Sequence, residues 1–211
     1  MMIRLIVADD HPVVREGLKR IISEQADMEL VAEAVDANEA LHQAQEIEAD
    51  VLLLDISMPG PGFLETLRRI RLKQPRLRVL VLSMHGEEHY AVRALRVGAS
   101  GYLTKERSPQ ELSAAIRRVH RGRKYLSVEV AERLAWELEA GVGKQPHELL
   151  SDREYQIFLM LGAAKSVTGI AGELNLSPKT VSTYRSRILA KMQLRSNAEL
   201  IRYAIQNGIA E

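Results

Sequence analysis

Short apolar runs and amphipathic segments alternate five times over residues 1–125 of this chain. The apolar runs have the length and composition of buried strands, and they cover residues 3–8, 29–34, 51–54, 78–83 and 101–104. The other segments place apolar residues at helical spacing, and they cover residues 12–25, 38–47, 63–74, 89–97 and 109–121. Strands that alternate with helices favour a parallel sheet with right-handed crossovers, so we expect a doubly wound α/β domain.

The pattern changes to helices alone after residue 148. Four serines are placed to cap successive short helices: Ser151, Ser166, Ser177 and Ser196. Glu154 and Glu199 follow the first and the last of them at the spacing of a capping box. These signals predict a small all-α domain of four helices.

A connecting segment separates the two patterns. Residues 127–140 have helical spacing, and the glycine, proline and charged residues that follow are typical of a linker. We therefore divide the chain into an α/β domain at 1–125, a linker with a helix at 126–147 and a helical domain at 148–211. The linker helix is expected to pack on the first domain, with a coiled-coil contact as the alternative.

Composition narrows the cellular setting. The chain has no cysteine, which excludes disulfides and thiolate metal sites and favours a reducing cytoplasm. The first apolar run reaches paired acids too soon for a signal peptide, and no stretch approaches the roughly 18 apolar residues of a membrane span. We therefore expect a cytoplasmic protein without membrane contact.

Three acidic residues stand at the ends of two predicted strands. Asp9 and Asp10 follow the first strand, and Asp55 follows the third. In a sheet ordered 2-1-3-4-5 these strands are neighbours, and their carboxyl ends meet where such folds bind ligands. Each acid alone is typical of a turn or a helix cap, but together they would form an acidic pocket that needs a cation. Oxygen ligands without imidazole or thiolate favour Mg²⁺.

Two further side chains are expected at the same edge of the sheet. Ser83 ends the fourth strand, and Lys105 follows the fifth. A serine or a lysine alone at a strand end indicates little. A carboxylate nucleophile, a divalent cation and a lysine that contacts phosphoryl oxygens together suit the formation of an aspartyl phosphate.

Sequence motifs along the chain resemble the LuxR-type response regulators, the NarL/FixJ group. They are IVADDHPVVREGL, VLLLDISMPG, VLSMH, GASGYLTKE, and LSDRE with LNLSPKTVSTYRSRI, and they span nearly the whole chain. The resemblance implies a flavodoxin-like (βα)5 receiver domain, a linker helix and a four-helix LuxR-type helix-turn-helix domain. It also implies a DNA-binding transcription regulator of a two-component system, phosphorylated by a sensor histidine kinase. Phosphoryl transfer to itself and autodephosphorylation are the only catalysis it implies.

The resemblance also assigns roles around the acidic pocket. Asp55 is the expected phosphate acceptor. Mg²⁺, or another divalent cation, is expected to bind Asp10, Asp55 and the main-chain carbonyl of Ser57. Asp9 would act on this cation directly or through water.

Three more residues complete the expected receiver site. By resemblance, Lys105 and Ser83 bind the phosphoryl group. Ser83 and Tyr102 form a switch pair, in which the serine turns toward the phosphoryl oxygens and the tyrosine fills the vacated space. An ordinary half-buried strand tyrosine is the alternative for Tyr102. Phe63 stands where the family often has glycine, and we expect it to alter the start of the next helix or a partner surface.

Cations concentrate near the end of the chain. Between residues 176 and 203 there are six lysines and arginines against one acid, whereas the whole chain carries a net charge of +1. This pattern indicates phosphate contacts, with a solvated basic helix as the alternative. By resemblance, the helix at 178–192 enters the major groove of double-stranded promoter DNA, with three hydroxyl side chains nearest the bases. The expected DNA contacts are Lys179, Ser182, Thr183, Tyr184, Arg185, Ser186, Arg187 and Lys191.

The preceding helix departs from the usual family sequence. Val167 and Thr168 replace residues that commonly contact the DNA backbone, and Gly169 is expected to weaken a helix interior by about 1 kcal/mol relative to alanine. Ala164 stands where a glycine commonly ends the helix before it. We therefore expect weaker DNA binding or stronger dependence on a homodimer. The last helix is expected to pack in the core, with dimer contact as a further role.

Other functions fit parts of the pattern. An aspartate-nucleophile phosphatase also uses a strand-end aspartate with Mg²⁺, but it usually needs a second aspartate where this chain has Ser57. A helical domain that contacts protein or RNA is another alternative, as is an unregulated receiver, although the acidic trio and Lys105 argue against the latter. The six histidines lack metal-ligand spacing and are expected to be structural or surface residues.

Overall fold

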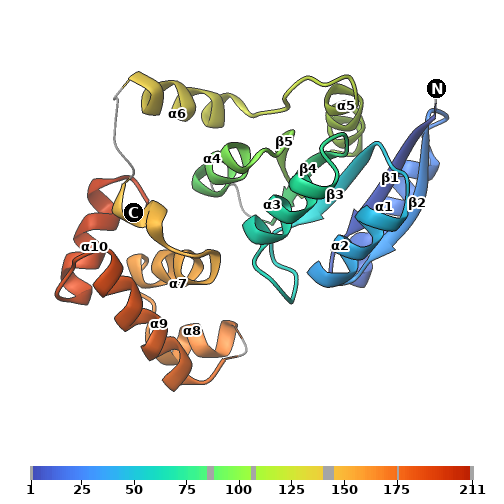
Figure 1. Cartoon of the computed structure of the whole chain (residues 1–211). Coiled ribbons are helices and arrows are strands. Elements are labelled where there is room, and N and C mark those ends of the chain that lie inside the picture. Colours follow the sequence, from blue (N-terminus) through green and yellow to red (C-terminus); the bar gives the residue numbers. More distant parts are fainter. Residues whose placement is uncertain (1, 85–87, 106–107, 140–144, 175, 210–211) are drawn as a thin grey trace. The chain divides into compact units, whose positions relative to one another are not determined.

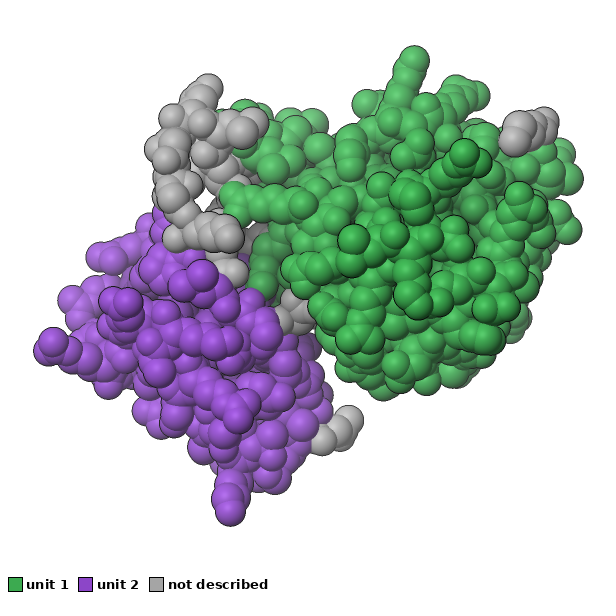
Figure 2. Space-filling model, in the orientation of Figure 1, with its two compact units in different colours: residues 1–140 green, residues 141–211 purple. Residues whose placement is uncertain are grey.

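A computed structural model describes residues 2–84, 88–105, 108–139, 145–174 and 176–209. The chain forms two compact units, Met1–Ala140 and Gly141–Glu211, which have different colours in Figure 2. The boundary between these units falls inside the segment 126–147 that the sequence predicts as a linker. The finer division into three segments stays a prediction.

Unit 1 contains a five-stranded parallel sheet with the order β2-β1-β3-β4-β5 (Figure 1). The strands are β1 (Ile3–Ala8), β2 (Met28–Ala34), β3 (Val51–Asp55), β4 (Arg78–Ser83) and β5 (Gly101–Thr104). Every residue of β3 is buried, as is typical of a parallel strand covered by helices on both faces. The doubly wound fold that the sequence predicts is confirmed.

Five helices alternate with these strands. They are α1 (Pro12–Ser23), α2 (Ala37–Glu46), α3 (Phe63–Lys73), α4 (Glu88–Val97) and α5 (Pro109–His120). One core cluster joins Ile22 of α1 and Ile116 of α5 to strand residues such as Leu53. Helices α2, α3 and α4 pack against one another in succession. Because all five strands are parallel, their carboxyl ends meet at one edge of the sheet.

Helix α6 (Val128–Glu139) also belongs to unit 1. It packs against α4, and its residue Val130 is buried. The segment before it is tied to β5 by a bridge between Gly101 and Tyr125. Glycine is required there, because a Cβ at Gly101 would lie 2.8 Å from the carbonyl oxygen of Tyr125. The position of α6 agrees with the expected packing on the first domain.

Unit 2 consists of helices in the residues that the structure describes. A short 3₁₀ turn, η1 (Pro146–Leu149), precedes α7 (Asp152–Gly162), α8 (Val167–Glu173), α9 (Pro178–Lys191) and α10 (Asn197–Gln206). Tyr155 and Phe158 of α7 are fully buried, as is Leu200 of α10. The predicted four-helix domain is confirmed. None of the helices in the described ranges of the chain has the length and apolarity that a membrane crossing requires.

The predicted serine caps are present, with one difference. Each serine side chain accepts a main-chain N–H at the start of its helix: Ser151, Ser166, Ser177 and Ser196. Ser151 and Glu154 form a complete capping box. The second box is incomplete, because the Glu199 carboxylate accepts the N–H of Arg195 at 2.8 Å, one residue before the cap.

Two departures noted in the sequence acquire a structural meaning. Gly169 donates its N–H to the capping oxygen of Ser166, so it lies in the first turn of α8 and the predicted helix-interior penalty does not apply. Ala164 follows α7 with φ 56°, a left-handed conformation that favours glycine. The family's usual glycine at this position therefore has a conformational reason.

Candidate functional sites

The three predicted acids lie together at the carboxyl edge of the sheet. β1 and β3 are hydrogen-bonded neighbours, so Asp9 and Asp10 after β1 meet Asp55 at the end of β3. Asp9 and Asp55 are fully buried, whereas the side chain of Asp10 keeps 28% of its exposure. Asp55 Oδ2 is buried and has no hydrogen-bond partner among the described residues. Buried carboxylate oxygens that converge in this way suit a divalent cation.

Lys105, one residue after β5, provides the positive charge inside this pocket. Its ammonium lies 2.6 Å from Asp9 Oδ2 and 2.9 Å from Asp55 Oδ1, and its side chain is only 6% exposed. Burial raises the pKa of Asp55, Lys105 lowers it, and the charges of Asp9 and Asp10 raise it again; the net shift is upward. The ionised carboxylate is therefore held at a cost, which an additional cation would reduce.

A histidine belongs to the same cluster. His11 Nδ1 lies 2.8 Å from Asp10 Oδ1, and ligand atoms of His11 and the three acids all fall within 4.8 Å of one another. The side chain of His11 is 57% exposed, which agrees with the predicted surface position, and its place directly after Asp9 and Asp10 brings its ring beside the acids.

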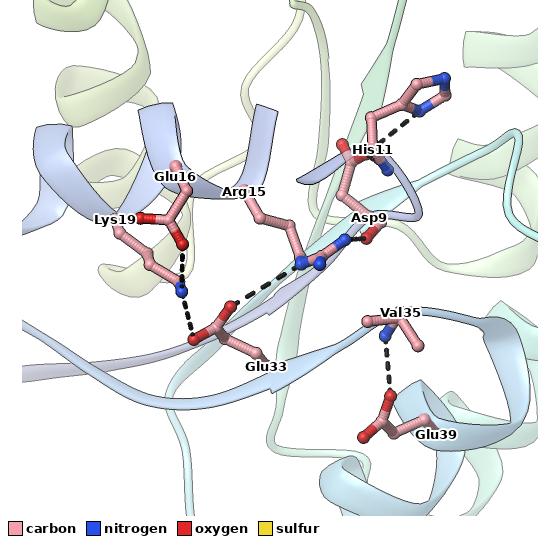
Figure 3. Close-up of polar contacts among 8 residues, drawn as sticks. All are labelled: Asp9, His11, Arg15, Glu16, Lys19, Glu33, Val35 and Glu39. Carbon is pink, nitrogen blue, oxygen red and sulfur yellow. Dashed lines mark hydrogen bonds and ion pairs between the residues drawn. The ribbon is translucent and has the colours of Figure 1, made fainter. Parts of the chain in front are cut away.

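Charged residues of α1 anchor the end of β1 (Figure 3). Arg15 Nη1 donates to the main-chain carbonyl of Asp9 at 2.7 Å, and its Nε lies 3.7 Å from Glu33 Oε2 on β2. Lys19 lies 2.8 Å from Glu33 and 2.7 Å from Glu16. This network joins α1 to β1 and β2 directly behind the acidic pocket.

The other predicted receiver residues surround the pocket at different depths. Ser83 ends β4 and is fully buried, and its carbonyl accepts the N–H of Lys105 at 2.7 Å. Tyr102 on β5 is only 5% exposed. Ser57 lies in the loop after β3 and is exposed.

Phe63 points into unit 1. It is the first residue of α3, is 6% exposed, and meets Tyr90 of α4 edge-on with ring centroids 5.6 Å apart. Together with Leu54 and Met58 it lines the hollow beside Asp55. Because Phe63 is buried at the first residue of α3, the structure favours an effect on the start of this helix and not on an exposed partner surface.

In unit 2, α8 and α9 form the predicted helix-turn-helix. Val181, Ile188 and Met192 are buried, as expected for the inner face of α9. The predicted contacts on the opposite face, Lys179, Ser182, Thr183, Ser186 and Arg187, are exposed. Two of their hydroxyls are used within the helix: Thr183 donates to the carbonyl of Lys179 at 3.0 Å and Ser186 to that of Ser182 at 3.1 Å.

Two of the predicted basic contacts have partners inside unit 2. Lys191 Nζ lies 2.6 Å from Oε2 of the buried Glu154, and Arg185 Nε donates to Asn197 Oδ1 at 2.6 Å. Both side chains join α9 to a neighbouring helix. Arg187 lies over the ring of Tyr184, 6.0 Å from its centroid. These groups therefore differ in how freely they can reach a duplex.

Two family models match the chain. The response regulator receiver domain matches residues 5–117, and the luxR family of bacterial regulatory proteins matches residues 148–204. The response regulator GacA of Pseudomonas viridiflava is 38% identical over 211 residues, covering 100% of this chain and 99% of its own. The response regulator UvrY of Escherichia coli K12 is 36% identical over 209 residues, covering 99% and 96%.

Solved structures give the same assignment. A LuxR-family two-component response regulator from Aurantimonas matches with a TM-score of 0.61 and 39% identity, covering 65% of this chain and 99% of its own. RcsB from Salmonella enterica bound to the rprA promoter matches with a TM-score of 0.61 and 26% identity, covering 96% and 98%. RcsB has also been solved as two dimers bound to two parallel DNAs. The chain therefore belongs to the LuxR-type, or NarL/FixJ, family of two-component response regulators.

Proposed function

We propose that this chain regulates transcription in the cytoplasm and that its receiver unit accepts a phosphoryl group on Asp55 from a sensor histidine kinase. The proposal depends most on one observation: Asp55 Oδ2 is buried, lacks a hydrogen-bond partner among the described residues, and belongs to a carboxylate 2.9 Å from the Lys105 ammonium. In the transfer, a carboxylate oxygen attacks the phosphorus of phosphohistidine. The new O–P bond forms while the P–N bond breaks, and the imidazole nitrogen keeps the electron pair.

A divalent cation fits the donors around this acceptor. Mg²⁺ would be held by Asp10, Asp55 and the main-chain carbonyl of Ser57, with Asp9 acting directly or through water. When bound, the cation supplies positive charge that offsets the acids and the incoming phosphoryl oxygens. Lys105 is already positioned among the same oxygens and would contact the phosphoryl group as a point charge.

The receiver is proposed to catalyse only reactions of its own phosphoryl group. Attack of water on the phosphorus breaks the O–P bond, releases inorganic phosphate and restores Asp55. Turnover of other phosphate esters is not expected, because Ser57 stands where such phosphatases usually have an acid–base aspartate.

Phosphorylation is proposed to act through Ser83 and Tyr102. The Ser83 hydroxyl would turn toward the phosphoryl oxygens, and Tyr102 would favour its buried position more strongly. Because Tyr102 is already buried, the expected change is a shift in population rather than a new packing. Tyr102 lies on β5, which packs against α4, and α4 in turn contacts α6, so the linker helix is the expected route of the response.

The helical unit is proposed to bind promoter DNA as a homodimer. The exposed face of α9, with Ser182, Thr183 and Ser186, would enter the major groove, while Lys179 and Arg187 contact phosphates. The same assignment includes Tyr184, Arg185 and Lys191 as contacts; the last two would have to keep or exchange their partners in unit 2. RcsB dimers on DNA support this arrangement by family likeness.

Labelling by acetyl phosphate tests the acceptor. The wild-type chain is expected to gain one phosphoryl group in Mg²⁺ and none in EDTA, measured by intact mass or phosphate-affinity electrophoresis. Asp55→Asn should abolish labelling, whereas the control Asp50→Asn, just before the other end of the same strand, should keep it. Equal labelling of wild type and Asp55→Asn would overturn the assignment. Selection of duplexes from a random pool by the full chain, with and without acetyl phosphate, tests the regulated DNA binding.

A further inference from the structure

Six cations gather at the amino edge of the sheet, the end opposite the acidic pocket. They lie in the last turn of α3, at the start of β4 and just after α5, and we call this cluster the basic edge: Arg71, Arg76, Arg78, Arg121, Arg123 and Lys124. Arg76, Arg121, Arg123 and Lys124 are exposed, and the other two are partly exposed.

Contacts with the turns at this edge hold several of these groups close together. Arg71 Nη1 donates to the carbonyls of Pro75 and Leu77 at 2.9 and 3.0 Å, in the turn before β4. The side chain of Arg71 also crosses the turn before β5, where its Nε would lie 3.3 Å from a Cβ at Gly98. Lys124 donates to the carbonyl of Ala99 in the same turn.

The segment after α5 is fixed against the start of β4. Arg118 Nε donates to the carbonyl of Lys124 at 2.8 Å, which holds the turn that carries Arg121 and Arg123. Nη2 of Arg78 would lie 3.7 Å from a Cβ at Gly122, within this turn. Three separate stretches of the chain therefore bring their cations to one surface.

The cations of the basic edge lack acidic partners. In the part of the chain that the structure describes, no carboxylate lies within 4.0 Å of any of the six, and the hydrogen bonds above all end on main-chain carbonyls. Neighbouring cations differ: Arg68 and Arg69 pair with Glu65, and Arg117 pairs with Asp27. Burial, and after it the nearby charges of Arg71 and Arg78, lowers the pKa of Lys124, as expected for a lysine placed close to other cations.

Helix dipoles do not account for this arrangement. A cation in the last turn of a helix is stabilised by the helix dipole, which applies to Arg71. It applies also to Arg121, the C-cap of α5, whereas Arg76, Arg78, Arg123 and Lys124 lie outside helices. Gathering them costs repulsion that an anionic partner would remove, and guanidinium groups match phosphate oxygens in bidentate geometry.

We propose that the basic edge binds the phosphodiester backbone of duplex DNA and so adds receiver contacts to those of the helical unit. The proposal rests on the proposed DNA binding by that unit. DNA is favoured over other polyanions because the helical unit, once bound, keeps the receiver at high effective concentration near the same duplex. Since backbone contacts carry no sequence information, the expected effects are on affinity and salt dependence, not on the preferred operator.

The test compares salt dependence in the full chain. The double variant Arg121→Gln, Arg123→Gln removes two exposed charges outside the helices, so the fold should be kept and circular dichroism should match wild type. Binding to a fluorescein-labelled duplex of mixed sequence is followed by anisotropy between about 50 and 200 mM KCl. The slope of log K against log salt should become shallower by about 2, and affinity at the lowest salt should fall roughly tenfold or more.

A matched control is available on α3. Arg68→Gln, Arg69→Gln removes the same number of charges from two arginines that share the carboxylate of Glu65 and lie outside the basic edge, and the slope should stay at the wild-type value. An unchanged slope in the Arg121/Arg123 variant, with wild-type binding intact, overturns the basic edge and leaves DNA binding by the helical unit standing. Absence of wild-type binding at every salt concentration overturns both. A vesicle flotation assay identifies a different partner. If wild type floats with phosphatidylglycerol vesicles, the Arg121→Gln, Arg123→Gln variant does not, and the salt dependence of DNA binding is unchanged, the basic edge binds a membrane instead of DNA.

Discussion

Replacing Lys105 with methionine tests whether one ammonium group stabilises the acidic pocket. Methionine keeps an unbranched chain of similar length and removes the charge. In the structure that ammonium lies 2.6 Å from Asp9 and 2.9 Å from Asp55, and both carboxylate side chains are 0% exposed. Without metal, the variant therefore leaves two buried like charges with no counter-ion.

The expected loss of free energy of unfolding in Lys105→Met is large for a single substitution. Removing one partner of a buried ion pair costs about 3–5 kcal/mol, and we expect about 3 kcal/mol because the adjacent Asp10 remains partly exposed to water. Adding Asp55→Asn to Lys105→Met removes one of the repelling charges and should restore roughly 1–2 kcal/mol, which is a coupling of ordinary size for residues in contact.

Asp55→Asn alone should stabilise the receiver unit at neutral pH. Burial raises the pKa of Asp55 in the folded chain above its unfolded value. For an acid with this direction of shift, stability falls as pH rises from the unfolded pKa through the folded pKa, and the loss persists above it. Asparagine cannot ionise, so the loss is removed.

Urea unfolding in EDTA and in Mg²⁺ measures these effects. Far-UV circular dichroism follows the unfolding, and the differences between variants and wild type report on unit 1, which carries these substitutions. Mg²⁺ binds the folded state and not the unfolded one, so at about 100 times its Kd it should raise the free energy of unfolding of wild type by about 2.7 kcal/mol. As a control, Lys19→Met removes an ammonium that is paired at the surface, and its effect on stability should be far smaller than that of Lys105→Met. If Lys105→Met unfolds like this control in EDTA, or if Asp55→Asn is less stable than wild type, the reasoning is refuted.

Three further substitutions test the packing of both units. Ala164→Gly should stabilise unit 2 by roughly 0.5–1 kcal/mol, because a residue with a Cβ is disfavoured at φ 56°. The control Ala163→Gly, at φ −77°, should destabilise the same unit. Urea midpoints of the two variants that shift in the same direction would contradict this explanation. Burial raises the pKa of Glu154, but hydrogen bonds from Lys191 and Ser151 outweigh this effect, and the net pKa is lowered. The contribution of Glu154 to stability is therefore lost as pH falls below about 4.5. Glu154→Gln should flatten the acid unfolding curve measured by circular dichroism. Phe63→Leu should cost about 1 kcal/mol through its contact with Tyr90; equal thermal midpoints of variant and wild type would show that the contact contributes little.

The fold could be predicted because its signals are local and repeated. β1, β4 and β5 have the predicted bounds, since apolar runs buried on both faces end where the chain turns polar. The acidic pocket could be predicted for a related reason. Once the strand order is inferred from the alternation of strands and helices, Asp9 and Asp55 must meet at neighbouring strand ends.

Side-chain partners could not be predicted in the same way. Glu199 has the spacing of a capping box, yet its carboxylate accepts from Arg195 because two N–H groups compete for it. Lys191 counts as a basic residue of α9, but its ammonium is bound by Glu154, 37 residues earlier in the chain. His11 has no ligand spacing along the chain, since Asp55 reaches it only through the sheet.

These partners change the expected salt dependence of DNA binding. Of the cations on α9, Lys191 is paired with Glu154 and Arg185 is bound to Asn197, which leaves Lys179 and Arg187 among the predicted contacts. Two phosphate contacts per chain give a slope of only about −2 in log K against log salt. A slope per chain steeper than about −3 therefore requires cations beyond these two. If the Arg121→Gln, Arg123→Gln variant removes that excess, the cations lie on the receiver. If the excess remains, the additional contacts come from the helical unit, either from its exposed Arg195 and Arg202 or from paired cations of α9 that exchange their partners for phosphate.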